Sequence, residues 1–311
     1  MQIINDIYKI YRHHLMDEYF YAGCAQLSML LEVSVDPKPG NIDRRHDFGE
    51  TRYEHFLASS VSAYQIFVRA YKSEETIGRL IRLGVEESHK WQRGGNTHFG
   101  AFTLLIPLLR ASKRIKDFVA YESEDDKLKE LKGVVSDVVR GTDVEDTLEF
   151  YKIFFSEKIR VEEAERYDIK DRASLQKLKV ENKSLYELME LSPKDNLVAR
   201  EWAEGYPITF EVAKNLMDRS KKDDFDINDS IVYEDVSLLS KHVDGLIVAK
   251  FGMEEALRVK ESANEIMKDY TIEKVRKFDS ELVKKGINPG CIADIIISSL
   301  YVFLAYGGYK I

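Results

Sequence analysis

The sequence predicts an all-α protein, built as a single globular multi-helix domain over residues 1–311, with a buried central helix and a charged peripheral helical region. Apolar residues recur at helical spacing along most of the chain. The alternating segments of four to eight residues, bounded by turns, that are typical of strands are missing. A hydrophobic fraction of 44% beside a charged fraction of 32% is the balance of a globular protein with a sizeable core.

The helical elements follow from local signals. The run GAFTLLIPLL at residues 100–109 is apolar nearly all round and predicts the buried central helix, in which Pro107 would introduce a kink. Three local patterns indicate helix starts: a capping box, a cap with an acidic first turn, and a cap followed by proline at the first helical position. These signals place helix starts at Thr51 with Glu54, at Thr142 with Glu145, and at Ser192 with Pro193 and Asp195.

The segment 113–190 differs from the rest in its density of charge. Stretches such as YESEDDKLKELK indicate solvated helices or a loosely attached insertion. Such charge runs are usually solvent-exposed faces, so no function is assigned to the segment.

Charge and cysteine content exclude several classes of protein. The net charge of −8, from 46 basic and 54 acidic residues, argues against a nucleic-acid partner. The two cysteines lack metal-type spacing and favour a reducing, cytoplasmic setting. The N-terminal MQIINDIYKIYRHH has no apolar signal-peptide core, and the apolar run at 295–306 is shorter than the roughly 20 residues that cross a bilayer. No membrane partner is therefore expected.

Four clusters interrupt the helical pattern. In LLEVSVDPKPGNIDRRHDF, residues 30–48, two prolines and a glycine stiffen a loop rich in Lys and Arg, which suits a polyphosphate, while nearby carboxylates suit Mg²⁺. In RGGNTHFG, residues 93–100, two glycines precede a helix start and can form an anion site, with a histidine as a possible acid or base. A stiffened connector and a packed histidine are the non-functional alternatives.

The two remaining clusters are weaker signals. SPKDNLVAREWAEGY, residues 192–206, is adequately explained as a capped helix with a spaced ion pair. NPGCIAD, residues 288–294, is predicted to lead into an apolar helix with Asp294 in its first turn. A carboxylate there either compensates the helix dipole or serves as a rigid ligand or base.

Taken together, EVSVDPKPGNIDR, GGNTH and NPGCIAD resemble the motifs of the triphosphoribosyl-dephospho-CoA synthase family, from about residue 27 to 304. The resemblance implies an all-α transferase that moves the triphosphoribosyl group of ATP onto a hydroxyl of dephospho-CoA and releases adenine. ATP is then a substrate, Mg²⁺ an inferred cofactor, and an acyl-carrier-type protein a possible later partner. The chain departs from the citrate-lyase-linked members in RRHDFGETRYEHF and in Cys291, which replaces the second glycine of the last motif.

The resemblance also implies the site residues, which are expected to converge. The catalytic candidates are His98, Asp43, Asp294 and Glu32, and the last three are also the Mg²⁺ candidates. The nucleotide- and phosphate-binding candidates are Lys38, Gly40, Arg44, Gly94, Gly95, Asn96 and Thr97. Pentosyl transfer passes through an oxocarbenium-like state, so the site must hold phosphates, stabilise positive charge and move two protons. A pentosyltransferase with another acceptor, an N-glycosidic hydrolase and a non-catalytic nucleotide- or CoA-binding module remain alternatives.

Overall fold

The computed structural model describes residues 17–115, 123–156, 172–192 and 195–307, and in these residues the protein contains fifteen helices and no strand. The predicted all-α class is confirmed. The helices are α2 (Glu18–Ser34), α3 (Tyr53–Lys72), α4 (Ile77–Trp91), α5 (Phe99–Arg114), α6 (Glu124–Arg140), α7 (Val144–Ser156), α8 (Arg172–Val180), α9 (Leu185–Leu191), α10 (Leu197–Glu204), α11 (Pro207–Arg219), α12 (Ile227–Lys241), α13 (Gly245–Phe251), α14 (Met253–Lys268), α15 (Ile272–Lys285) and α16 (Gly290–Tyr306).

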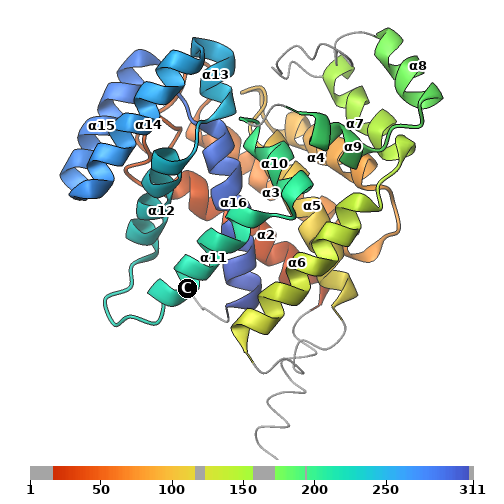
Figure 1. The fold of residues 1–311 in the computed structure, drawn as a ribbon, viewed down its shortest axis with the longest axis horizontal. Coiled ribbons are helices and arrows are strands. Elements are labelled where there is room, and N and C mark those ends of the chain that lie inside the picture. Colours follow the sequence, from red (N-terminus) through yellow and green to blue (C-terminus); the bar gives the residue numbers. More distant parts are fainter. Residues whose placement is uncertain (1–16, 116–122, 157–171, 193–194, 308–311) are drawn as a thin grey trace, which may run out of the picture.

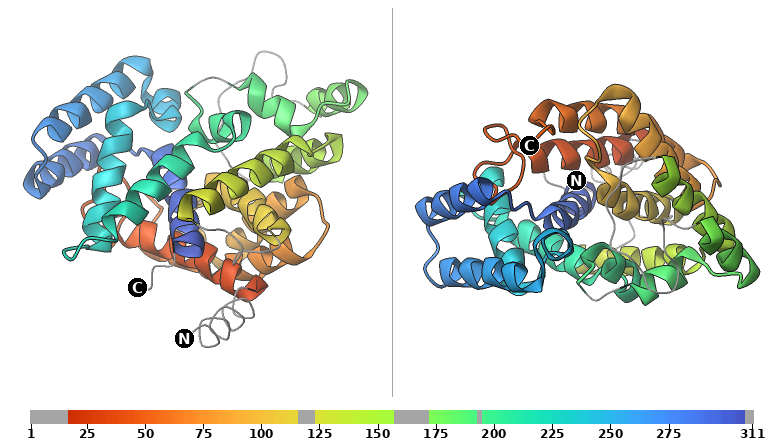
Figure 2. Two further views of the ribbon diagram at one scale, coloured as in Figure 1. Left: turned by 60° about the horizontal axis from the view of Figure 1, so that its bottom comes forward. Right: turned by 90° about the horizontal axis from the view of Figure 1, so that it is seen from above.

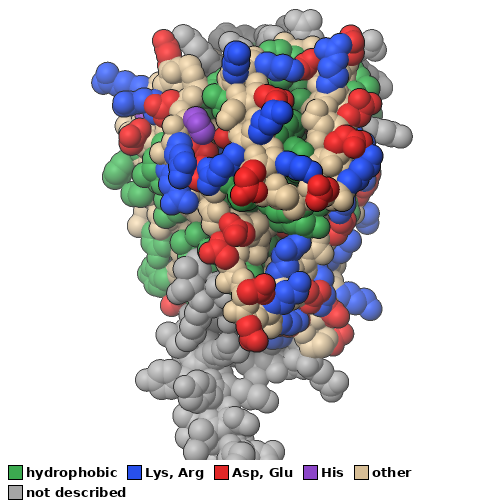
Figure 3. Space-filling model, turned by 90° about the vertical axis from the view of Figure 1, so that its left-hand side faces the viewer, with side chains coloured by type: hydrophobic (Ala, Val, Ile, Leu, Met, Phe, Trp, Pro, Cys, Tyr) green, Lys and Arg blue, Asp and Glu red, His purple; other side chains and the backbone are tan. Residues whose placement is uncertain are grey.

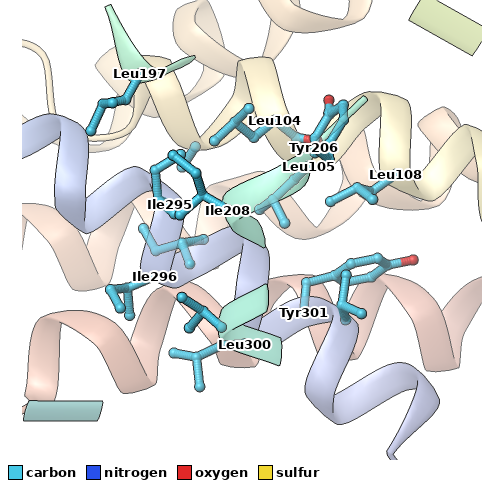
Figure 4. Close-up of a cluster of buried hydrophobic side chains, with 14 of the residues drawn as sticks. Leu104, Leu105, Leu108, Leu197, Tyr206, Ile208, Ile295, Ile296, Leu300 and Tyr301 are labelled. Carbon is cyan, nitrogen blue, oxygen red and sulfur yellow. The ribbon is translucent and has the colours of Figure 1, made fainter. Parts of the chain in front are cut away.

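Two apolar helices, α5 and α16, form the centre of the molecule (Figure 1). Helix α16 packs against α2, α5, α11 and α12, while α5 also packs against α3, α4 and α6. Nearly every side chain of α5 from residue 100 to 112 is buried, so the prediction of a buried central helix is confirmed, with Pro107 inside it. Figure 4 shows the core between these helices, formed by Leu104, Leu105, Leu108, Leu197, Tyr206, Ile208, Ile295, Ile296, Leu300 and Tyr301.

The remaining helices flank this centre on two sides (Figures 1 and 2). Helices α12 to α15 lie on one side, where α12 packs against α14 and α14 against α13. Helices α4 and α7 to α9 lie on the other, with α4 against α7. On the face of α12, α14 and α15, acidic and basic side chains are interleaved (Figure 3). No helix in the described part of the chain combines the length and apolar character that crossing a membrane requires.

Within the charged segment, the described residues form α6 to α9 and contribute apolar side chains to the core. Helix α6 buries one stripe of leucines and valines while its other face carries the charges, as an amphipathic helix does. Residues 116–122 and 157–171 of this segment lie outside the described residues.

The three predicted helix starts are wrong by a few residues. Helix α3 begins at Tyr53, because Thr51 instead donates its hydroxyl hydrogen bond to the carbonyl of Gly94, at 2.6 Å. Helix α7 begins at Val144, and the carboxylate that accepts its first N–H groups belongs to Asp143 rather than Thr142. Helix α10 begins at Leu197 with Asn196 as its cap, while Ser192 ends α9; Pro193 lies outside the described residues.

Candidate functional site

The Pro-x-Pro-Gly loop joins α2 to α3 and is fixed to α12 and α15. The side-chain amide of Asn228, at the start of α12, exchanges two hydrogen bonds of 3.0 Å with the backbone of Asp36. The amide of Gly40 donates to Asp279 of α15 at 2.9 Å. Gly40 has φ +71°, and a Cβ there would lie 2.3 Å from the carbonyl oxygen of Ile287, so only glycine fits. The loop is therefore a rigid part of the fold.

The predicted pair Glu32 and Lys38 forms a buried ion pair. The Lys38 Nζ lies 2.6 Å from Glu32 Oε1, and both side chains are 2% exposed. Burial raises the pKa of Glu32, and the Lys38 ammonium opposes that rise. Burying a charge is costly unless it is paired, so the loss of either side chain would leave the other as an uncompensated buried charge.

Asp235 and Asp294 interact electrostatically with this pair, and a third carboxyl group, Asp244, interacts with both of them. Burial raises the pKa of Asp235 on α12 to about 8, with the negative charges of Glu32, Asp244 and Asp279 adding to the rise and Lys38 opposing it. Burial likewise raises the pKa of Asp294 well above its usual value, and Glu32 and Asp244 add to that rise. Burial raises the pKa of Asp244 to about 6. A single ammonium thus faces an excess of acidic groups, some of which must hold protons near neutral pH.

Asp235 and Asp244 differ in their partners. Asp244 caps α13 by accepting the N–H groups of Leu246 and Ile247, and its second oxygen accepts the N–H of Ile292 at 2.9 Å. It therefore ties α13 to the start of α16. Asp235 is 3% exposed, yet it receives no hydrogen bond within the described part of the chain. Unpaired buried carboxyl groups are uncommon and often functional.

Asp294 joins the last family motif to the second. Its carboxyl is partly buried and accepts a hydrogen bond from the backbone N–H of Ala101, in the first turn of α5. Gly100 makes the approach possible, since a Cβ at that position would lie 1.9 Å from the Asp294 carboxylate oxygen. Helix α16 begins at Gly290, so Asp294 lies beyond the first turn and its carboxyl serves α5 instead of its own helix.

His98 lies just before α5 and is 2% exposed. Its Nδ1 is 2.8 Å from the Ser59 hydroxyl, its ring packs edge-on against Phe56, and its Nε2 is buried without a partner in the described part of the chain. Burial, and secondarily the charge of Lys38, lower the pKa of His98 to about 3. Lys38 therefore acts electrostatically on both His98 and Asp294, one from each of the other two motifs.

Other predicted residues have local partners. The Gly94 amide donates to the side chain of Gln92, and Gly94 packs closely against His55, so that amide is already used. Asn96 accepts the N–H of Phe99 at 3.1 Å, as a helix cap does. Gly95 has φ +78° and open space where a Cβ would lie. Arg44 is exposed, and of the residues that the structure describes its side chain bonds only to Asn228, at 3.4 Å.

One group of side chains has the spacing of a metal site. Asp43, His46 and Asp279 each offer a ligand atom, all within 4.8 Å of one another. The structure does not bring Glu32 or Asp294, the other predicted Mg²⁺ ligands, into this group. The three side chains also interact with one another, because the His46 ring nitrogen lies 3.3 Å from Asp43 and 3.6 Å from Asp279. Burial raises the pKa of Asp279 to about 6, while His46 opposes that rise.

Sequence reasoning missed Asp235, Asp244, Asp279 and Ser59. A signal existed for Asp235: it falls on the buried stripe of α12, three residues after Val232 and four before Leu239. A carboxylate at such a position is rare and could have been singled out. Asp279 and Ser59 carry no comparable signal, because their importance comes from groups far away in the chain.

Comparison with known proteins agrees with the motifs. The chain matches the ATP:dephospho-CoA triphosphoribosyl transferase family over residues 18–310. The comparison with curated proteins gave no match. Among solved structures, it is similar to an Archaeoglobus fulgidus protein described as a triphosphoribosyl-dephospho-CoA synthase, with 32% identity and a TM-score of 0.66. That match covers 83% of this chain and 100% of the other. The chain therefore belongs to the ATP:dephospho-CoA triphosphoribosyl transferase family.

Proposed function

We propose that this chain transfers the triphosphoribosyl group of ATP onto a hydroxyl of dephospho-CoA, with release of adenine, at the cluster of ionisable groups around Lys38. Family membership gives the reaction. The observation that supports this location is the meeting of three family motifs: Lys38 acts electrostatically on His98 and Asp294, and Asp294 binds the backbone at Ala101.

The reaction breaks the bond between the anomeric carbon and the adenine nitrogen and forms a bond from that carbon to the acceptor oxygen. Adenine must gain a proton and the hydroxyl must lose one, while the sugar carries positive charge in the transition state. Asp235 is our candidate for the acid, because it is unpaired and holds its proton near neutral pH. Glu32 and Asp294 are candidates for facing the positive sugar and for accepting the hydroxyl proton.

The triphosphate needs cations. Arg44 and Arg45 lie on the exposed side of the loop, and Arg45 pairs with Asp36 at 3.1 Å. Their guanidinium groups suit phosphate oxygens better than Lys38, which is buried and already paired.

A divalent cation fits the group of Asp43, His46 and Asp279, because two carboxylates and an imidazole are suitable ligands at compatible spacing. When bound, an ion such as Mg²⁺ would neutralise phosphate charge. Both cysteines are unpaired, which fits a reducing cytoplasm. We further propose an acyl-carrier-type protein as a later partner that receives the product of this reaction.

The test is adenine release from ATP. Purified protein is incubated with ATP, Mg²⁺ and dephospho-CoA, then assayed for free adenine by chromatography and for the product by mass spectrometry. We expect adenine only when dephospho-CoA is present, together with a product heavier than dephospho-CoA by the triphosphoribosyl group. Release without acceptor would identify a hydrolase, and binding of ATP without release would identify a binding module; either result would contradict the proposal.

A further inference from the structure

We propose that His98 acts on the substrate as a neutral hydrogen-bond donor through Nε2–H, and that Ser59, Ser88 and Thr97 hold it in this tautomer. This inference deepens the proposed function, because it assigns the predicted acid or base a different role. Ser59 and Ser88 become positioning residues that the sequence motifs do not include.

The first step is the direction of a chain of hydrogen bonds. The Ser88 hydroxyl donates to the Ser59 oxygen at 2.8 Å, and Thr97 lies 3.3 Å from Ser88. Ser59 in turn lies 2.8 Å from Nδ1 of His98. A hydroxyl has one proton to donate, and Ser88 spends its proton on Ser59. The Ser59 proton then has Nδ1 as its acceptor, and Thr97 donates to Ser88.

The second step follows from the chemistry of a neutral imidazole. One ring nitrogen carries the proton and the other accepts, so an accepting Nδ1 places the proton on Nε2. In the folded protein Nε2 is buried and has no partner among the described residues. A buried donor without a partner is costly, and a substrate acceptor atom would satisfy it.

The third step is charge. Burial and the nearby Lys38 ammonium keep the ring neutral, with the pKa lowered to about 3. A general base must present an unprotonated nitrogen to the substrate, but the nitrogen lone pair of His98 is directed to Ser59. A neutral donor stabilises negative charge or a lone pair at a fixed position without exchanging a proton. The ligand atom is therefore a hydrogen-bond acceptor of the nucleotide, either a phosphate oxygen or a purine nitrogen.

The first experiment compares His98→Gln, His98→Asn and His98→Ala. The glutamine amide reaches the position of Nε2 and can donate, whereas the asparagine amide reaches only the position of Nδ1. For adenine release, we expect a loss of ~10²–10³-fold for His98→Ala, typical of a missing donor to a reacting group. His98→Asn should lose as much, while His98→Gln should be at least roughly tenfold better than either. Equal losses in all three variants would overturn the donor role.

The second experiment needs no turnover. In protein labelled with ¹⁵N-histidine, ring nitrogen shifts distinguish protonated from unprotonated positions, and His98→Gln assigns the signals. We expect unprotonated Nδ1 and protonated Nε2 from pH 5 to 8, and a mixture of tautomers in Ser59→Ala. Ser60→Ala is the matched control, because Ser60 is a buried serine of the same helix whose hydroxyl, among the described residues, bonds only to the Phe56 carbonyl. Protonated Nδ1 in the unmodified protein would overturn the inference.

Titration with ATP, adenine and inorganic triphosphate then identifies the acceptor. A shift of the Nε2–H signal with ATP supports the inference. If adenine reproduces the shift, the acceptor is a nitrogen of the base; if inorganic triphosphate reproduces it, the acceptor is a phosphate oxygen. If that shift occurs while no adenine is released under any condition, the proposed function fails and the donor role stands. If adenine is released normally and none of the three ligands moves the signal, the donor role fails and the function stands.

Discussion

Two buried carboxyl groups of this protein, Glu201 and Asp235, have similar burial but differ in their hydrogen-bond partners. Glu201, at the junction of α10 and α11, is fully buried and accepts the backbone N–H groups of Ile208 and Thr209 at 2.9 and 2.8 Å. Asp235 is 3% exposed and accepts nothing within the described residues. Burial raises the pKa of both, to about 7 and about 8.

The difference shows that burial and a raised pKa do not by themselves mark a functional group. Glu201 satisfies the free N–H groups at the start of α11, which every helix must satisfy somewhere, so its position has a structural explanation. Asp235 has no such explanation. It lies near Lys38 and Glu32, where the family motifs meet, and its missing partners are what a ligand would supply.

The largest effect is expected within the site itself, from Lys38→Met. Removing the ammonium leaves Glu32 buried without a partner, which costs about 3–5 kcal/mol of unfolding free energy. Chemical denaturation measures this cost. The double variant Glu32→Leu with Lys38→Met should recover most of the stability while adenine release stays absent. A single variant as stable as the unmodified protein would show that the pair is not buried as described.

Asp235→Asn tests the functional half of the comparison. If Asp235 protonates adenine, the variant should lose ~10²–10⁴ in the rate of adenine release, the usual contribution of a general acid. The unfolding free energy should be unchanged or higher, because no hydrogen bond is lost. Rate and stability are measured on the same preparation. A large fall in stability with normal turnover would make Asp235 a structural residue like Glu201.

The pH dependence of stability gives a second measure of Asp235. Its pKa rises from 3.8 to about 8 on folding, so the folded state binds the proton more tightly than the unfolded state. The resulting stability is present below pH 4 and is lost as the pH rises through 8. Relative to the unmodified protein, Asp235→Asn should therefore gain stability from pH 4 to pH 8 and level off above it. Each pKa unit corresponds to about 1.4 kcal/mol. Denaturation at pH 5 and pH 8 measures the gain, and an equal difference at both would contradict the assignment.

Glu201→Gln tests the structural half. A glutamine keeps one accepting oxygen but turns an amide toward the second backbone N–H, so the variant should lose about 1–3 kcal/mol of stability. Thermal and chemical denaturation measure the loss. Adenine release per folded molecule at 25 °C should match that of the unmodified protein. A specific loss of turnover at full stability would place Glu201 in the reaction and remove the contrast with Asp235.

Sequence reasoning could predict those features that are encoded locally. The apolar run at residues 100–109 determines a buried helix by itself, and the loop glycines and prolines mark Gly40 and Gly94 as unusual positions. Helix ends were less predictable, because the Thr51 hydroxyl has a competing acceptor 43 residues away. The sequence identified the motif residues, but it did not show which of their side chains pair with one another.

The site beyond the motifs depends on long-range contacts. Ser59 is important because the fold places it beside His98, and Asp279 because it holds the Gly40 amide from α15 and lies beside Asp43 and His46. The pairing of Lys38 with Glu32 also changes its expected role, since a paired and buried ammonium is a poor phosphate ligand. None of these relations follows from spacing along the chain.

The smallest effect is expected beside Glu201, at an ion pair between two side chains of α10. Arg200 pairs with Glu204 one turn later at 3.0 Å, where Glu204 is exposed and Arg200 is partly exposed. Exposed pairs at this spacing contribute only about 0.3–0.5 kcal/mol, so Arg200→Ala should hardly change the denaturation midpoint and should leave adenine release unchanged. High salt should reduce even this difference, because it screens exposed charges. Arg200 is also electrostatically coupled to the buried Glu201 carboxylate. A loss of stability above about 1 kcal/mol would mean that the charge of Arg200 stabilises that carboxylate. The region around Glu201 would then depend on a charge pair, as the region around Lys38 does.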